Sequence, residues 1–351
     1  MAQRRAVDLP RLAAEVALRG ATDRDFEFES AQNVLVKTFP RWFFGTVWVT
    51  IFFSATVVAV AADLPPPPKP VPRFQAVPQP YQQISFQRDG FEIARYHYST
   101  NLNRPFLFPI IGPSGRALTR MGHPHDPETH SHHNSIWISH RDVNGVNFWE
   151  DGRSGAKIIH KKIEKISDGE AATSLVTLND WTDGAGKILL KERRQMTLRE
   201  LPANEWLLVF DLEFKAAGDD AVFGKTPFGL VGVRMTGSIG VNDGGGTIRN
   251  SDGASNEPGV HWKPARWVDY SGPIAPKAIE GLTLFDHPAN PNHPSVFHVR
   301  NDGWMGACLT YEKPITVSSA QPLKLRYSIY VHAGAPSIAT LSEFGKSIAG
   351  R

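Results

Sequence analysis

A histidine-rich stretch, HPHDPETHSHH, occupies residues 123–133 and holds five of the chain's thirteen histidines. Imidazole titrates near neutral pH and is a common metal ligand, so this cluster indicates proton transfer, metal binding or recognition of a polar ligand. In an extended chain, residues two apart share a face. Two histidine pairs are therefore expected to converge, with His133 pointing away: His123 with His125, and His130 with His132.

A metal site is one hypothesis for these pairs, because HxH motifs ligate zinc, copper, iron and manganese. The carboxylates of Asp126 and Glu128 would orient or complete such a site. The alternative is a proline-rich loop whose side chains only make turn hydrogen bonds. If a divalent metal is bound, the predicted ligands are His123, His125, His130 and His132.

Two later segments, residues 251–272 and 285–303, collect acids, imidazoles, guanidinium groups and tryptophan with little apolar content. Such groups serve as general acids, general bases and anchors for polar substrates. Arg234 lies in an apolar segment, where an unpaired charge is costly, so it needs an anionic partner or an anionic ligand. The predicted catalytic residues are His125, His132, Glu257 and Asp286. The predicted substrate-binding residues are Arg234, Arg266, Trp267, His287, His293 and Arg300.

Composition places the chain among globular proteins. Its 351 residues are 41% hydrophobic and 10% aromatic, which suffices for a large core. The formal net charge is +3, and Lys and Arg are spread along the chain, so nucleic acid is not expected as a partner. The single cysteine, Cys308, has apolar neighbours and is predicted to be a buried strand thiol.

The amino-terminal region has the features of a targeting segment. Residues 1–35, which include the acidic stretch DRDFEFES, are untypical of a segment that precedes a signal, and translation from near Val36 would leave them out. Residues 36–62 combine basic Lys37 and Arg41 with an apolar run that ends in Ala-Val-Ala. This pattern predicts a cleaved signal peptide or, if it stays uncleaved, a membrane anchor.

The rest of the chain divides into two parts. Residues 63–80 form a proline-rich linker, and residues 81–351 are expected to form one β-sandwich domain. We therefore predict an exported protein, periplasmic or extracellular, that contacts the membrane only through an uncleaved amino-terminal segment.

Alternating apolar residues predict the fold. The segments FEIARYHY, EWLLVFDLEF and LKLRYSIYVH alternate with period two, which is typical of strands, and turn residues separate such segments. In the first, Phe91, Ile93 and Arg95 would share a face. A strand, an Asn144-Gly145 turn and an aromatic-rich strand are expected in SIWISHRDVNGVNFWED. A helix is expected only near SIATLSEFGKSI. Roughly sixteen strands would build an all-β, large antiparallel sandwich.

Several motifs resemble those of the PmoA-like family of bacterial proteins. They are HSHHNSIWISHRDVNGVNFWED, GVRMTGSIGVNDGGGTIRNSDG, KPARWVDYSG, LFDHPANPNHPSVFHVRNDG and PLKLRYSIYVHAG, in this order between about residues 84 and 335. The resemblance implies an exported protein of bacteria that degrade polysaccharides. A membrane methane monooxygenase subunit needs several apolar spans, whereas this chain has one, so methane oxidation is not expected.

From these observations we predict a carbohydrate-active enzyme of the glycoside hydrolase, lyase or sugar epimerase type. By analogy, its fold is expected to be a mutarotase-like supersandwich. Imidazole and carboxylate would act as acid and base on either side of a sugar ring. The alternatives are a metal-dependent enzyme with a histidine-cluster site and a non-catalytic carbohydrate-binding module.

Removal of residues 1–62 should leave a soluble protein that unfolds cooperatively, because the signal-like run and the linker contribute nothing to the core. Circular dichroism during thermal unfolding checks this. Aggregation of the truncated chain without a cooperative transition would contradict the domain division.

Overall fold

The predicted alternation produces long antiparallel strands. The computed structural model describes residues 69–123, 125, 130–152 and 154–350, and the residues from Pro67 onward form one compact unit. The predicted leader, the signal-like segment and most of the linker lie outside the described residues. Within the described ranges, no helix is long and apolar enough to cross a membrane.

A nine-stranded sheet forms one layer of the molecule. Each pair of neighbouring strands is antiparallel. In spatial order the strands are β1 (Phe74–Gln79), β2 (Gln83–Arg88), β3 (Phe91–His97), β4 (Phe106–Ile110), β5 (Ile136–His140), β11 (Gly229–Arg234), β17 (Trp304–Cys308), β16 (Val296–Arg300) and β13 (Lys263–Pro264).

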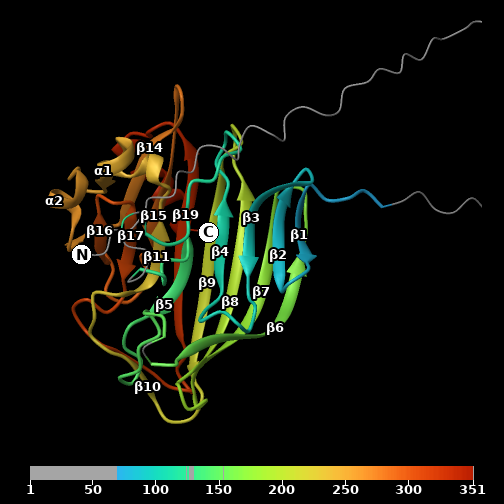
Figure 1. Cartoon of the computed structure of the whole chain (residues 1–351), viewed down its shortest axis with the longest axis vertical. Helices are drawn as coiled ribbons and strands as arrows, with labels where there is room; N and C mark the ends of the chain where they lie inside the picture. The colour runs from blue at the N-terminus through green and yellow to red at the C-terminus, as the bar shows by residue number, and fades with distance from the viewer. Residues whose placement is uncertain (1–68, 124, 126–129, 153, 351) are drawn as a thin grey trace, which may run out of the picture. The chain divides into compact units, whose positions relative to one another are not determined.

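An eight-stranded antiparallel sheet forms the second layer, and Figure 1 shows β1–β4 lying across β6–β9. Its strands, in spatial order, are β12 (Thr247–Asn250), β14 (Trp267–Ala275), β15 (Ala278–Asp286), β19 (Leu323–Ala333), β9 (Trp206–Ala216), β8 (Ile188–Glu200), β7 (Ala172–Thr182) and β6 (Lys157–Ser167). The remaining elements are β10 (Ala221–Phe223), β18 (Ile315–Val317), the 3₁₀ helix η1 (Gly237–Ile239), α1 (Val241–Gly244), α2 (Asn256–Val260) and α3 (Ile338–Ala349).

The core lies between the two sheets, where the apolar faces of their strands meet. In β9, Leu208, Phe210, Leu212 and Phe214 are buried and pack with the inward residues of β19. The large antiparallel sandwich and the carboxyl-terminal helix predicted from the sequence are confirmed. Cys308 is buried in β17, and burial raises the pKa of its thiol, as expected for a core cysteine.

Three local predictions were wrong. The linker does not extend to residue 80, because Phe74 and Ala76 alternate inward and make Phe74–Gln79 a strand. In β3, register shifts turn Ala94 and Tyr96 into the core and leave Phe91 77% exposed. After the Asn144-Gly145 turn, both of whose residues have positive φ, the aromatic segment is not a strand.

In that aromatic segment, the side chain of Asn147 accepts hydrogen bonds from the backbone N–H groups of Trp149 and Glu150. The Asn147 side chain thus satisfies two backbone N–H groups that would pair with a neighbouring strand if this segment were part of a sheet. Local capping therefore outweighs the strand propensity of the aromatic residues.

A buried ion pair lies on the inner face of the eight-stranded sheet. Arg194 Nε lies 2.5 Å from Glu192 Oε1, and both side chains are almost fully buried. Trp181 Nε1 donates to the second carboxylate oxygen of Glu192 over 2.8 Å. Removing one member of such a pair leaves an uncompensated charge in the core.

Arg194→Met should therefore lower the free energy of unfolding by about 3–5 kcal/mol, measured by chemical denaturation. The control is Arg193→Met in the same strand, whose partner Glu164 lies on the exposed side of the sheet. That change should cost less than about 1 kcal/mol. Equal losses in the two variants would show that the buried pair has no special role.

Candidate functional site

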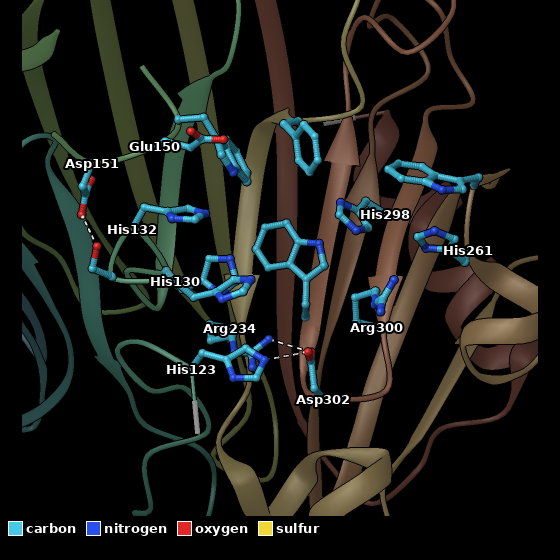
Figure 2. Close-up of a pocket in the computed structure, with 16 residues that line it drawn as sticks. His123, His130, His132, Glu150, Asp151, Arg234, His261, His298, Arg300 and Asp302 are labelled. Atoms are coloured by element: carbon cyan, nitrogen blue, oxygen red, sulfur yellow. Dashed lines mark hydrogen bonds and ion pairs between the residues drawn. The ribbon is translucent and has the colours of Figure 1, made fainter. Parts of the chain in front are cut away.

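One cavity of about 890 Å³ lies on the outer face of the nine-stranded sheet, away from the sandwich core. Its lining comes from three distant parts of the chain (Figure 2). The lining residues are His123, His130, Ser131, His132, His133, Trp149, Glu150, Asp151, Phe228, Arg234, His261, Trp262, His298, Arg300, Asp302 and Trp304.

Strand register explains why distant residues meet there. Gly232 pairs with Trp137 on β5 and with Gly306 on β17, and Gly306 pairs with His298 on β16. Paired residues lie on the same face of a sheet, and so do residues two positions apart. Arg234, Trp304 and Arg300 therefore share this outer face, while the residues between them face the core.

The two glycines make room for aromatic rings. A Cβ atom at Gly232 would lie 2.8 Å from atoms of both Trp137 and Trp304, and one at Gly306 would lie 2.7 Å from Trp304. Because no side chain stands there, the indoles lie flat over the strands. Trp137, Trp149 and Trp304 form, with Phe106, a separate buried cluster.

Asp302 joins two of the predicted residues. Its Oδ1 accepts from Arg234 Nη1 over 2.8 Å, and its Oδ2 lies 2.9 Å from His123 Nε2. The anionic partner predicted for the fully buried Arg234 is confirmed. Burial opposes ionisation of Asp302, but Arg234 and then the His123 hydrogen bond outweigh it and keep the pKa of this carboxyl below its ordinary value.

The hydrogen bonds of His123 fix its tautomer. Nδ1 accepts from the backbone N–H of His125 over 3.1 Å, so the ring proton is on Nε2 and is donated to Asp302. Burial lowers the pKa of His123, so the ring is neutral near pH 7. His123 therefore anchors the histidine stretch.

His125 does not enter the cavity. Its side chain is 69% exposed and lies 3.1 Å from Asp243 of α1. His133, which was expected to point away, lines the cavity instead and stacks on Trp304 with a centroid separation of 5.1 Å. Burial, followed by the neighbouring His132 and Arg234, lowers the pKa of His133 strongly.

Two more imidazoles face the cavity from its other side (Figure 2). Nδ1 of His261 lies 2.9 Å from the carbonyl oxygen of Val299, which can only accept, so in the neutral ring Nδ1 carries the proton and Nε2 has the lone pair. Burial, followed by His261 and Arg300, lowers the pKa of His298 to about 3. Near neutral pH this side of the cavity therefore presents an uncharged His298.

Arg104 organises the side of the cavity that carries His132. This fully buried guanidinium donates to the carbonyl oxygens of His132 and Trp149 over 3.3 and 2.9 Å, and to Asp151 over 2.6 Å. The carboxylates that line the cavity are Glu150, Asp151 and Asp302.

Glu257, predicted as a catalytic carboxylate, is not among the lining residues. Its oxygens lie 3.1 Å from Arg300 Nε and accept from the backbone N–H of Asn301 over 2.9 Å. The Glu257 backbone N–H in turn donates to the Asn301 side chain. Glu257 therefore holds the β16–β17 turn that carries Arg300 and Asp302.

The other predicted residues lie at a second cavity, beneath α3. They are Arg266, Trp267, Asp286, His287 and His293. Trp267 is 1% exposed and packs against Phe285 and Leu341, so it is a core residue and offers no stacking surface to the first cavity. Both oxygens of Asp286 are used internally, by Asn290, His293 and the Ser295 backbone.

The structure thus assembles only part of the predicted site. His123, His130, His132, Arg234 and Arg300 share the cavity with residues that were not assigned roles, among them His133, His261, Trp262, His298 and Asp302. Alternation in VFHVRND, where His298 and Arg300 occupy one face, is the signal that could have identified part of this set.

The four-histidine metal site is not assembled. In the part of the chain that the structure describes, no group of three or more His, Cys, Asp or Glu side chains could hold a metal ion. Within the proposed ligand set, His125 contacts α1 and Nε2 of His123 is used by Asp302. Asp126 and Glu128 lie outside the described residues.

Comparison with known proteins gives a family. A match covers residues 83–344 and is described as a family of unknown function (DUF6807). The chain belongs to this family. No curated protein matches it. The resemblance to PmoA-like proteins is not tested by this match and stays a prediction.

Among solved structures, the chain is similar to a TPR-domain-containing protein from Parabacteroides distasonis, with 10% sequence identity and a TM-score of 0.35. The similarity covers 75% of this chain and 49% of that one, so the chain spans about half the length of that protein. The mutarotase-like supersandwich also stays a prediction.

Buried neutral histidines make stability depend on pH. The pKa of His298 is about 3 in the folded protein and ordinarily 6.5, so below 6.5 the unfolded chain binds more protons and stability falls. His298→Gln should reduce this dependence between about pH 6 and 4 by up to 1.36 kcal/mol per pH unit. Denaturation of parent and variant across this range measures the slopes, and identical slopes would contradict a neutral buried His298.

Proposed function

We propose that the protein is an exported carbohydrate-active enzyme that transfers protons at a sugar bound in the histidine-lined cavity. The observation that carries the proposal is the placement of imidazoles on two opposite sides of one cavity of about 890 Å³. Small-molecule sites typically have volumes of about 300–1,000 Å³. Acid–base chemistry at a sugar needs proton-transfer groups on both sides of the ring.

His261 is the best-placed general base. Its Nδ1–H is held by the Val299 carbonyl, so its Nε2 lone pair is oriented by the backbone of β16. A base with a fixed tautomer needs no reorganisation before it accepts a proton. His132, on the opposite side and positioned through Arg104, is the acid–base partner.

Trp262 takes the binding role expected of Trp267. It lines the cavity and is half-buried, whereas Trp149 and Trp304 are buried. Its φ of 57° is in the left-handed region, which bulky residues rarely adopt. The ring also stacks on His298 with a centroid separation of 4.4 Å. Aromatic surface beside polar groups suits a sugar, which has an apolar C–H face and a polar rim.

Arg300 supplies a cationic hydrogen-bond donor beside these rings. Its side chain is 52% exposed and is held by Glu257, so it faces the cavity in a defined position. The proposal of export depends on the signal-like residues 36–62 alone, which lie outside the described structure.

His261→Ala and His132→Ala should each lower turnover about a hundredfold or more, because each removes a proton-transfer group. The double variant should be no slower than the poorer single one, since groups that act as one unit are not additive. Incubation with a panel of oligosaccharides, followed by mass spectrometry of the products, measures turnover. The control is His287→Ala, which removes an imidazole from the other cavity and should leave turnover unchanged.

The same assays separate the two tryptophans. Trp262→Ala should weaken oligosaccharide binding with little loss of melting temperature, whereas Trp267→Ala should lower stability by about 3–5 kcal/mol. Binding without turnover by the parent protein would support the non-catalytic module instead. Unfolding of the His261 and His132 variants, with full activity in the folded fraction, would make these residues structural.

A further inference from the structure

A second cavity, of about 440 Å³, lies between α3 and the strands β14, β15 and β19 of the eight-stranded sheet. Trp267, Phe285, Pro288, Ile348 and Ala349 supply its apolar lining. This site shares no lining residue with the histidine-lined cavity, and the inference about it does not rest on the proposed function.

A single glycine shapes this space. A Cβ atom at Gly345 would lie 3.0 Å from Phe285 Cε1 and 4.0 Å from Trp267 Cδ1, so the bare backbone of α3 faces both rings. Any larger residue would displace the helix or Phe285. The helix therefore lies close to the sheet while the neighbouring side chains leave a volume open beside the indole.

The lining residue Trp267 has one buried polar atom without a hydrogen-bond partner in the described residues. Trp267 is 1% exposed, and its Nε1–H, next to Cδ1, makes no hydrogen bond within the described residues. A buried donor without an acceptor costs about 1–3 kcal/mol. A ligand that supplies an acceptor to this N–H would recover this energy.

The charged groups at this cavity favour a negative ligand. Arg266 and Lys346 line it, and each forms an ion pair with an exposed carboxylate, Asp252 at 3.2 Å and Glu343 at 2.7 Å; Arg266 also donates to the carbonyl oxygen of Ser251. Such exposed pairs contribute little, so their exchange for another carboxylate costs little. The one acid in the lining, Asp286, is already occupied by three internal donors.

We propose that this cavity binds a monocarboxylate with a single apolar chain, of the medium-chain fatty acid class. The apolar chain fills the cavity beside Trp267 and Phe285, a carboxylate oxygen accepts from the indole N–H, and the charge is balanced by Arg266 and Lys346. The site is part of the sandwich itself, since its walls are β14, β15, β19 and α3.

Isothermal titration calorimetry of the full chain with sodium decanoate tests the site. The parent should bind one equivalent. Ser342→Phe, which places a ring into the cavity from α3, should abolish binding, whereas Ala339→Phe, on the exposed first turn of the same helix, should leave it unchanged. The melting temperature of each variant shows that it is folded.

Two further measurements test the chemistry of the ligand. Trp267→Phe keeps the aromatic surface but removes the N–H donor, and should weaken decanoate binding about tenfold or more. Decanol, which lacks the charge, should bind at least about tenfold more weakly than decanoate. Absence of saturable decanoate binding, equal binding to Ser342→Phe, or tighter binding of decanol would each overturn the proposal. None of these outcomes bears on the histidine-lined cavity.

Discussion

A buried guanidinium group is the constraint on which the site depends. Arg234 has no exposed surface and lies at the end of a central strand, so the fold must bring a negative charge to it. Asp302 meets this requirement from the β16–β17 turn, and its second oxygen accepts a hydrogen bond from the Nε2–H group of His123. The Asp302 carboxylate therefore links His123 of the histidine stretch to Arg234 of β11 and to the turn before β17. On the opposite wall, Arg104 links His132 to Trp149 by donating hydrogen bonds to the carbonyl oxygens of both residues.

Hydrogen bonds to these imidazoles divide them into two kinds. Both ring nitrogens of His123 form hydrogen bonds within the protein, so this residue has a structural role. In His261 only Nδ1 forms such a bond with the described residues, and Nε2 is left for a ligand in the cavity. Burial keeps His133 and His298 neutral, so the cavity wall is rich in imidazole without accumulating positive charge. Residue type alone would have given all of them the same role.

The strands and the fold class could be predicted because period-two alternation reports directly on burial, as in Leu208, Phe210 and Leu212. Arg234 was also predictable, since a charge in an apolar strand requires a partner. Trp267 and Trp262 were not distinguishable by composition, because both lie in polar surroundings in the sequence. Trp267 lies beneath α3 because β14 pairs with β15. Trp262 lies beside His298 because β13 pairs with β16. Register, which local sequence specifies weakly, decided between them.

The order of strands in the nine-stranded sheet has a consequence for how the cavity comes into being. Its lining extends in the chain from His123 to Trp304 and includes residues of β11, β16 and β17, which are neighbours in space. Contacts of such large sequence separation carry a high loop-closure entropy and form slowly. No contiguous fragment shorter than this interval contains the cavity. Ligand binding therefore reports the pairing of β11, β17 and β16, and during refolding it would appear only after these strands have paired.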